Sequence, residues 1–589
     1  MSPPIGCQWT PSAVTVSSGA ITASPNSTGR ARRRTRTAVG VAPADRYVIV
    51  CGDALHLRLP EQRPDRIALR AEAAKVAETE AAFTPALAGI GEHRSRGEWI
   101  RAHAAEHGDP RHGRFALIGP KGRYVTRLVK LVARLRALAA ATRSVAPETE
   151  AALARRWREL PAHVRTPAQL LGTRTAGCEG THGVFPRCDL TCTPCYHARS
   201  ANRVRTDGQH TLEQIDRQMA YLRKTRGTGQ HAQLIGGEVT LLGPEDHAAA
   251  LELMHRHGRK PMSMTHGDFD YEYLKRLAVG RDGRRRVDML RFAGHFDSLM
   301  LGRRGIPRPA SEAELHPYRR RFVAQFERLR REHGVRYDLA HNMTVTPRNL
   351  DQVAEVVREC RGMGFGMLSF QPAAYVGNPR RWREDFHAVS IDSVWREIER
   401  GAGTRLPWSH LQMGDERCNR SAYGVLVGDR WTALLDDREP RDLRVRDAFL
   451  SAFGGMDFDR PRWALAIATA RVLAGDPRLI GVGTGWARRF VRRVGPLALL
   501  RGHPRGLTFV VHAFMDAEVV RPAWEALQRD ETAADPAVRA AQERLRACSY
   551  AMAHPDQDRL VPACVQHAVL DPQENTRLAA LLPLPEPQR

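Results

Sequence analysis

The sequence predicts an α/β protein with a parallel sheet, closed or partly closed into a barrel, after a helical N-terminal region and before an α+β extension. Three observations predict this fold class. Short apolar runs alternate with longer amphipathic stretches between residues 171 and 400, six such runs can be counted, and three cysteines follow directly after the first. Such alternation is typical of parallel sheets, whose chemistry lies in the loops after the carboxyl ends of the strands.

Six short apolar runs are expected to be the strands, with helices between them. The clearest helix is "TLEQIDRQMAYLRK", residues 211–224, in which Thr211 and Gln214 have the spacing of a capping box. The expected strands are 182–186, 232–237, 261–266, 289–297, 339–345 and 366–372.

The chain is expected to contain four regions. Residues 1–45 have the low hydrophobicity and high charge of a disordered basic tail, and 46–170 have helical periodicity. Residues 171–400 hold the strand and helix alternation, and 401–589 form the extension. In the second region, leucines recur at helical spacing between basic residues: Leu128, Leu131, Leu135 and Leu138.

The chain is strongly basic, with a net charge of +25 and a pI near 10.4. Such a charge would suit nucleic acid, an anionic membrane surface or an anionic substrate. The arginine excess is spread over the whole chain, which is typical of a GC-rich genome, so we expect no specific nucleic-acid partner.

The cysteines and the apolar segments predict a cytoplasmic protein. The ten cysteines do not form the dense framework of a disulfide-rich secreted domain. The first 29 residues lack the continuous apolar core of a secretory signal, and no uncharged apolar run reaches the roughly 18 residues that a membrane span needs. We therefore expect a protein that is neither exported nor integral to a membrane.

The stretch "FPRCDLTCTPCYH" carries Cys188, Cys192 and Cys195 as C-x3-C-x2-C. A structural zinc site normally has four ligands and a redox dithiol has two. Three closely spaced thiolates instead suit a [4Fe-4S] cluster whose fourth iron is left open. Zinc, with His182 or His197 as the fourth ligand, is the alternative.

The stretch "LIGGEVTLL" follows on the next expected strand. Gly236 and Gly237 allow a close backbone approach, and Glu238 supplies a carboxylate for a cationic group. Alone this is a common turn. Forty-odd residues after the cysteine motif, however, the Gly-Gly-Glu stretch favours the [4Fe-4S] cluster, because a zinc-binding module does not need this stretch.

With both motifs in place, residues 180–380 resemble the radical S-adenosylmethionine (SAM) superfamily. The resemblance implies a partial (β/α)6 TIM-like barrel, a [4Fe-4S] cluster on Cys188, Cys192 and Cys195, and SAM bound with its ammonium at Gly236, Gly237 and Glu238. It also implies an electron donor such as flavodoxin or ferredoxin. Reductive cleavage of SAM would release methionine and a 5′-deoxyadenosyl radical that abstracts a substrate hydrogen.

Two positions depart from the pattern that the resemblance implies. Pro194 stands where many members have an aromatic residue near adenine, and Tyr196 follows the third cysteine instead; Val239 replaces the usual proline. Asp297 and Ser298, at the end of the fourth expected strand, are candidate contacts of the SAM ribose or the substrate. A hydrogen-bonded carboxylate at the barrel top is the alternative for Asp297.

Cys418, Cys548 and Cys564 lie in polar, turn-rich segments of the extension. "AFMDAEVVRPAW" and "LVPACVQH" resemble the radical SAM branch that contains the archaeal tetraether lipid synthase and a methylase of the methanopterin pathway. The resemblance implies an auxiliary iron-sulfur cluster on the three cysteines. Alternatively, each of the three cysteines is simply a small buried hydrophobic residue.

The branch resemblance and the segment 485–500 favour a lipid or other apolar substrate and a peripheral membrane contact. In "GWARRFVRRVGPLALL", one helical face carries Trp486, Phe490, Val494 and Leu497, as in an interfacial helix. The arginines around it are Arg488, Arg489, Arg492 and Arg493. An ordinary packed helix with a solvated basic face is the alternative. A methylase of a heterocycle or peptide, and a zinc protein that interacts with nucleic acid, are the competing functions.

Overall fold

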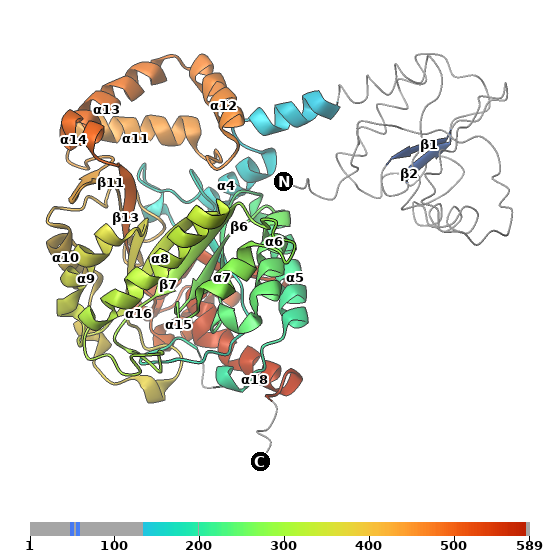
Figure 1. The fold of residues 1–589 in the computed structure, drawn as a ribbon, viewed down its shortest axis with the longest axis vertical. Helices are drawn as coiled ribbons and strands as arrows, with labels where there is room; N and C mark the ends of the chain where they lie inside the picture. Colours follow the sequence, from blue (N-terminus) through green and yellow to red (C-terminus); the bar gives the residue numbers. More distant parts are fainter. Residues whose placement is uncertain (1–47, 52–54, 59–132, 198–199, 585–589) are drawn as a thin grey trace. The chain divides into compact units, whose positions relative to one another are not determined.

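The computed structural model describes residues 48–51, 55–58, 133–197 and 200–584 (Figure 1). The chain divides into two compact units, Met1–Arg143 and Ser144–Arg589. In the first, β1 (Val48–Cys51) pairs with β2 (Leu55–Arg58) in antiparallel fashion, although the sequence predicts helices there. Residues 133–142 are helical, as expected. The predicted basic tail, 1–45, lies outside the described residues.

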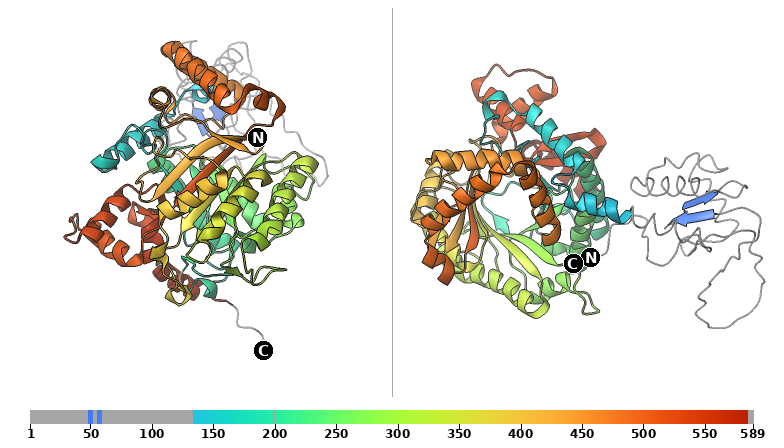
Figure 2. Two further views of the ribbon diagram at one scale, coloured as in Figure 1. Left: turned by 90° about the vertical axis from the view of Figure 1, so that its left-hand side faces the viewer. Right: turned by 90° about the horizontal axis from the view of Figure 1, so that it is seen from above.

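The second unit contains an 11-stranded sheet in the order β12-β11-β13-β10-β9-β7-β6-β5-β3-β14-β15. Neighbours from β13 to β14 in this order are parallel, while β11, β12 and β15 add antiparallel edges. The sheet curls into a half-barrel with helices around it (Figure 2). This confirms the predicted mixed α/β class.

The strands of this unit include two short ones outside the large sheet, β4 and β8, which pair with each other. Their bounds are β3 (Cys178–Gly180), β4 (Thr191–Cys192), β5 (His231–Leu234), β6 (Lys260–Thr265), β7 (Met289–His295), β8 (Met300–Leu301), β9 (Arg336–Val345), β10 (Met367–Pro372), β11 (Asn419–Val427), β12 (Arg430–Ala433), β13 (Arg505–His512), β14 (Tyr550–His554) and β15 (Arg559–Pro562).

The helices lie between and beyond these strands. Their bounds are α4 (Pro147–Glu159), α5 (Gly208–Arg226), α6 (Pro244–Arg256), α7 (Tyr271–Ala278), α8 (His316–His333), α9 (Val353–Met363), α10 (Ile391–Ala402), α11 (Pro440–Phe453), α12 (Arg462–Gly475), α13 (Arg478–Val494), α14 (Pro496–Arg501), α15 (Ala517–Gln528), α16 (Pro536–Arg546), α17 (Ala563–Val565) and α18 (Asp571–Leu581). Within the described part of the chain, no helix has the length and apolar character that crossing a bilayer requires.

Five of the six expected strands are present, as β5, β6, β7, β9 and β10. The first expected strand, 182–186, is wrong: β3 comes earlier, at Cys178–Gly180, and 182–186 is a loop. Val184 and Phe185 are buried in this loop because it packs against the core. Their burial gives the loop the apolar character of a strand.

Helix α5 begins before the residues that the capping-box spacing indicates. Its N-cap is Asp207, whose carboxylate accepts a hydrogen bond from the His210 amide at 3.0 Å. The Thr211 hydroxyl donates instead to the Val184 carbonyl at 3.0 Å. Thr211 therefore anchors the loop that leads to the cysteine motif.

The segment 401–589 does not form a separate sheet. It supplies β11, β12 and β13 at one side of the half-barrel and β14 and β15 at the other. Strand β14 lies beside β3 with Tyr550 opposite Cys178. Because β3 leads into the cysteine motif, the extension supports the segment that carries it. The boundaries at residues 171 and 400 stay predictions.

A buried ion pair supports the loop after β7. Arg319 Nη2 donates to Glu312 Oε2 at 2.6 Å, and both side chains are 0% exposed. Glu312 Oε1 accepts from the Ser298 amide at 2.7 Å. A buried charge that loses its partner costs far more free energy than an exposed one.

Replacing Arg319 with Met should therefore lower the free energy of unfolding by about 3–5 kcal/mol, because Glu312 would stay buried without its counter-ion. The neighbouring Arg320, whose pair with Glu359 is exposed, is the matched control. Arg320→Met should change stability by less than about 1 kcal/mol. Urea denaturation of both variants checks this; equal effects would contradict the assigned role of the buried pair.

Candidate metal and cofactor site

The cysteine loop is held at the carboxyl edge of the half-barrel by contacts with the loops after β7 and β10. Cys192 lies in β4, opposite Met300 of β8, and the Thr193 amide donates to the Leu299 carbonyl at 3.1 Å. A Cβ at Gly377, in the loop after β10, would lie 2.2 Å from the Cys195 carbonyl oxygen. The loops after β7 and β10 therefore both position the motif.

Gly236 and Gly237 bring the loop after β5 against the backbone just before Cys188. The Gly237 amide donates to the Phe185 carbonyl at 2.6 Å, and the Glu238 amide donates to the Arg187 carbonyl at 2.8 Å. A Cβ at Gly237 would lie 1.9 Å from the Arg187 carbonyl oxygen, and one at Gly236 would lie 2.6 Å from the Phe185 ring. Only glycine allows this approach.

The three motif thiols are partly buried and influence one another electrostatically. A hydrogen bond from Cys192, with the positive field of His197, lowers the pKa of Cys195 to about 5. The same bond, with burial, raises the pKa of Cys192. Burial, followed by the charge of Glu238, raises the pKa of Cys188 to about 12. The structure thus brings all three predicted ligands and Glu238 into one neighbourhood.

The Glu238 carboxylate is 1% exposed and is held by hydrogen bonds from within the chain. Its Oε1 accepts from the hydroxyls of Thr240 at 2.7 Å and Thr265 at 2.6 Å. Its Oε2 accepts from the His266 amide at 2.8 Å. The carboxylate therefore connects the loop after β5 to the end of β6, and contact with a SAM ammonium stays a prediction.

Asp297 and Ser298 lie beside the cysteine loop and are also hydrogen-bonded within the chain. The Asp297 carboxylate accepts from His295 Nε2 at 2.6 Å, the Thr344 amide at 3.1 Å and the Leu299 amide at 3.0 Å. The charge of Asp297 contributes to the raised pKa of Cys192. Asp297 thus orders the segment that carries β8, and its contact with a ribose stays a prediction.

Tyr196 lies beneath the loop after β5 and packs against the extension. Its hydroxyl donates to the Gly236 carbonyl at 3.4 Å, and its ring centroid is 4.3 Å from that of His567. Three buried polar atoms near Tyr196 have no hydrogen-bond partner among the described residues: His197 Nδ1, His567 Nε2 and the Tyr550 hydroxyl. Unpaired buried polar atoms are rare, so this neighbourhood suits a polar ligand.

Of the two histidines that the sequence offers as a fourth zinc ligand, His182 is turned toward His554 and Glu574. His197 Nε2 donates to the Gly236 carbonyl, and its Nδ1 has no partner among the described residues, so zinc with His197 stays the alternative. Among the described residues, Cys188, Asp189 and His266 have ligand atoms within 4.8 Å of one another. His266, however, donates from Nε2 to Asp189 and accepts at Nδ1 from the Asp268 amide, so neither nitrogen is free for a metal.

Cys418, Cys548 and Cys564 come together although they are distant in the sequence. Burial, followed by the charges of Cys548 and Cys418, raises the pKa of Cys564. Arg544 Nε lies 3.1 Å from Cys418 Sγ and can stabilise a thiolate. Sequence reasoning missed Cys178, which packs with Cys548 around Tyr550. Cys178 lies only ten positions before Cys188, so its place in the sequence suggests that it belongs with the motif cysteines rather than with Cys548.

No family model and no curated protein matches this chain. A search of solved structures found similarity to anSMEcpe, an anaerobic sulfatase-maturating radical SAM enzyme, in structures described as containing bound AdoMet. For the native enzyme with AdoMet the TM-score is 0.23 and the identity 18%, over 34% of this chain and 51% of that one. For the complex with the Cp18Cys peptide the TM-score is 0.25 and the identity 12%, over 52% of this chain and 99% of that one. The chain thus spans about half the length of the first structures it matches, 50% and 51%.

Gly237→Ala should lower the free energy of unfolding by about 1–3 kcal/mol, because its methyl group would overlap the Arg187 carbonyl and force the loops apart. Gly362 is the matched control, since a Cβ there would meet no atom within 4 Å. Gly362 lies within α9, so its replacement by Ala should be neutral or slightly stabilising. Urea denaturation compares the two; an unchanged Gly237→Ala protein would contradict the close approach.

Proposed function

We propose that this chain is a radical SAM enzyme that reductively cleaves SAM and uses the 5′-deoxyadenosyl radical to modify an unactivated C–H position. One observation carries the proposal. The C-x3-C-x2-C loop is seated on the glycine pair of "GGE" at the carboxyl edge of a parallel half-barrel, the edge where α/β folds place their chemistry. The unpaired buried atoms beside Tyr196 fit a polar ligand there.

In this proposal Cys188, Cys192 and Cys195 hold a [4Fe-4S] cluster, which when bound supplies the electron for SAM cleavage. The chain itself supplies position and exclusion of water. Glu238, bonded on both oxygens, keeps the loop after β5 in place for SAM. Asp297 similarly keeps the loop after β7 in place beside Cys192.

An auxiliary iron-sulfur cluster is proposed for the cysteines of the extension. Cys418, Cys548 and Cys564 affect one another's ionisation, and Cys178 lies close to Cys548. Arg544 and Arg226 place positive charge beside this group: Arg226 Nη1 donates to the Cys178 carbonyl at 3.1 Å. Burial raises the pKa of Cys178 and of Cys418 to about 11, and the neighbouring arginines oppose that rise, which helps the thiolates that an iron-sulfur cluster needs.

The proposed apolar or lipid substrate and membrane contact rest on only part of the face that the sequence indicates, Leu497, together with exposed apolar residues beside it. In α13, Trp486 donates to the Leu434 carbonyl at 2.9 Å and Val494 is buried, so this apolar face packs inward. Arg489 and Arg493 bind the buried Asp442. The exposed apolar residues lie on the helices around α13 (Figure 1): Trp463 and Ile467 on α12, Ile480 on α13, and Leu497 and Leu500 on α14.

Cys192→Ala, compared with Cys360→Ala, tests the role of the motif thiols. Cys360 is fully buried in α9 and is the matched control. After anaerobic reconstitution, Cys192→Ala should lose the iron, the sulfide and the dithionite-dependent release of 5′-deoxyadenosine from SAM, because no neighbouring thiol can replace it. Cys360→Ala should retain all three. Equal iron content and equal SAM cleavage in the two variants would contradict the proposal.

Binding to lipid vesicles tests the membrane contact. The full chain should co-sediment with vesicles of phosphatidylglycerol and phosphatidylcholine, less so at high salt because surface charge is screened. Leu500, which is 82% exposed, should contribute through burial in the bilayer surface. Leu500→Glu should weaken binding by roughly tenfold, the effect of removing one buried leucine.

Leu581 is the matched control, since it is 66% exposed but lies on α18, outside this group of helices. Leu581→Glu should leave vesicle binding unchanged. Equal loss in both variants, or no binding by the unaltered chain, would overturn the membrane contact and leave the SAM chemistry in place.

A further inference from the structure

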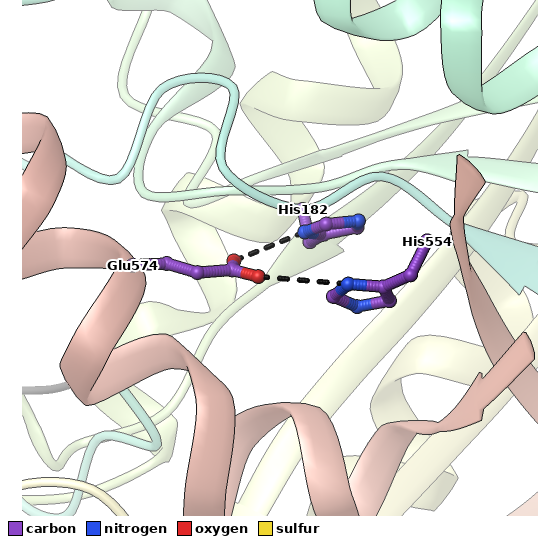
Figure 3. Close-up of side chains that lie close together, drawn as sticks. All are labelled: His182, His554 and Glu574. Atoms are coloured by element: carbon purple, nitrogen blue, oxygen red, sulfur yellow. Dashed lines mark hydrogen bonds and ion pairs between the residues drawn. The ribbon is translucent and has the colours of Figure 1, made fainter. Parts of the chain in front are cut away.

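A second group of potential metal ligands lies apart from the cysteines, where the extension meets β3 (Figure 3). His182 follows β3, His554 ends β14 and Glu574 lies on α18, so three elements contribute one side chain each. Their ligand atoms lie within 4.8 Å of one another, and the two imidazole rings stack at 4.0 Å. None of the three has a role in the proposed SAM chemistry.

Gln566 determines which nitrogen of His554 faces the group. Its amide nitrogen donates to Asp571 Oδ1 and Glu574 Oε2, both at 2.9 Å, so the amide cannot be reversed without facing two carboxylates with its oxygen. The amide oxygen therefore accepts from His554 Nε2 at 2.6 Å. The proton of neutral His554 is on Nε2, and the Nδ1 lone pair faces Glu574.

His182 is oriented in the same way. Its Nε2 donates to the Ala553 carbonyl at 2.8 Å, which leaves Nδ1 directed at Glu574 Oε2, 3.0 Å away. Metal-binding histidines commonly donate from one nitrogen to a carbonyl or amide oxygen while the other binds the metal. Both histidines here have that outer partner in place.

Nδ1 of His182, Nδ1 of His554 and the Glu574 carboxylate thus face one another. Without an ion, His182 Nδ1 donates a proton to Glu574 Oε2, and a bound ion would displace that proton. His554 Nδ1 and Glu574 Oε1 are 3.8 Å apart, too far for a hydrogen bond. Two metal bonds of about 2.0–2.2 Å can span that separation. Because an imidazole binds a metal in the plane of its own ring, one of the two stacked rings would turn when an ion binds.

We propose that His182, His554 and Glu574 bind a divalent transition-metal ion, with Zn²⁺ the ion whose ligand preferences they match. Two imidazoles and one carboxylate form a common protein ligand set for zinc, with water in the fourth position. The Glu574 side chain is 21% exposed, which gives an ion a route in. The bound ion would tie α18 and β14 to the segment that leads into the cysteine motif.

Cobalt and zinc titrations of the full chain test this proposal. Co²⁺ bound to nitrogen and oxygen ligands gives visible ligand-field bands without the near-ultraviolet charge-transfer band of thiolates. The difference between the cobalt absorption spectra of the unaltered chain and of His554→Gln should therefore contain ligand-field bands and no thiolate charge-transfer band. Glu574→Gln and His554→Gln should each weaken Zn²⁺ binding by about tenfold or more, measured by competition with a chromogenic chelator. Zn²⁺ should also raise the thermal midpoint of the unaltered chain but not of Glu574→Gln.

His257 and Asp216 provide matched controls, because they form a histidine and carboxylate pair at 2.7 Å without a second histidine. His257→Gln and Asp216→Asn should leave the cobalt spectrum and the zinc affinity unchanged. Circular dichroism establishes that each variant is folded. Two results on the unaltered chain alone would overturn the proposal. One is a cobalt spectrum that shows only thiolate-bound cobalt, and the other is a thermal midpoint that Zn²⁺ leaves unchanged.

Discussion

The approach of Gly236 and Gly237 to the backbone of Phe185 and Arg187 is the constraint on which the arrangement of the cysteine loop depends. It places the loop after β5 directly against the segment that enters the motif, with two backbone hydrogen bonds and no room for a side chain. The pairing of β4 with β8 and the approach at Gly377 then hold the far side of the loop. The motif is thereby held by the loops that follow β5, β7 and β10.

The extension completes this arrangement from the other side. Strand β14 lies beside β3, and Tyr196 packs on His567 of the extension. The same region brings Cys418, Cys548 and Cys564 near Cys178, and it places His554 and Glu574 against His182. A segment that is remote in sequence therefore contributes both to the neighbourhood of the motif and to two further groups of potential ligands.

The sequence predicts strands β5, β6, β7, β9 and β10 because their apolar runs are local signals. It misplaces the first strand because Val184 and Phe185 are buried by loop packing, which no local pattern distinguishes from burial in a sheet. The cysteine motif and "GGE" can be found because their spacing is short. The group of His182, His554 and Glu574 cannot, because 392 positions separate His182 from Glu574 and His554 reaches His182 through the pairing of β14 with β3, two strands remote in sequence. The Glu238 carboxylate is likewise recognisable as a site residue, whereas its hydrogen bonds to Thr265 and His266 depend on the neighbouring strand.

The central claim is that the seated cysteine loop holds a cluster with an iron open to SAM. Electron paramagnetic resonance of the anaerobically reconstituted, dithionite-reduced chain, recorded with and without SAM, tests it most directly. The account predicts the signal of a reduced [4Fe-4S] cluster whose g-values shift when SAM is added, because SAM binds the iron that lacks a cysteine. A chain without such a signal, or with a signal that SAM leaves unchanged, would contradict it.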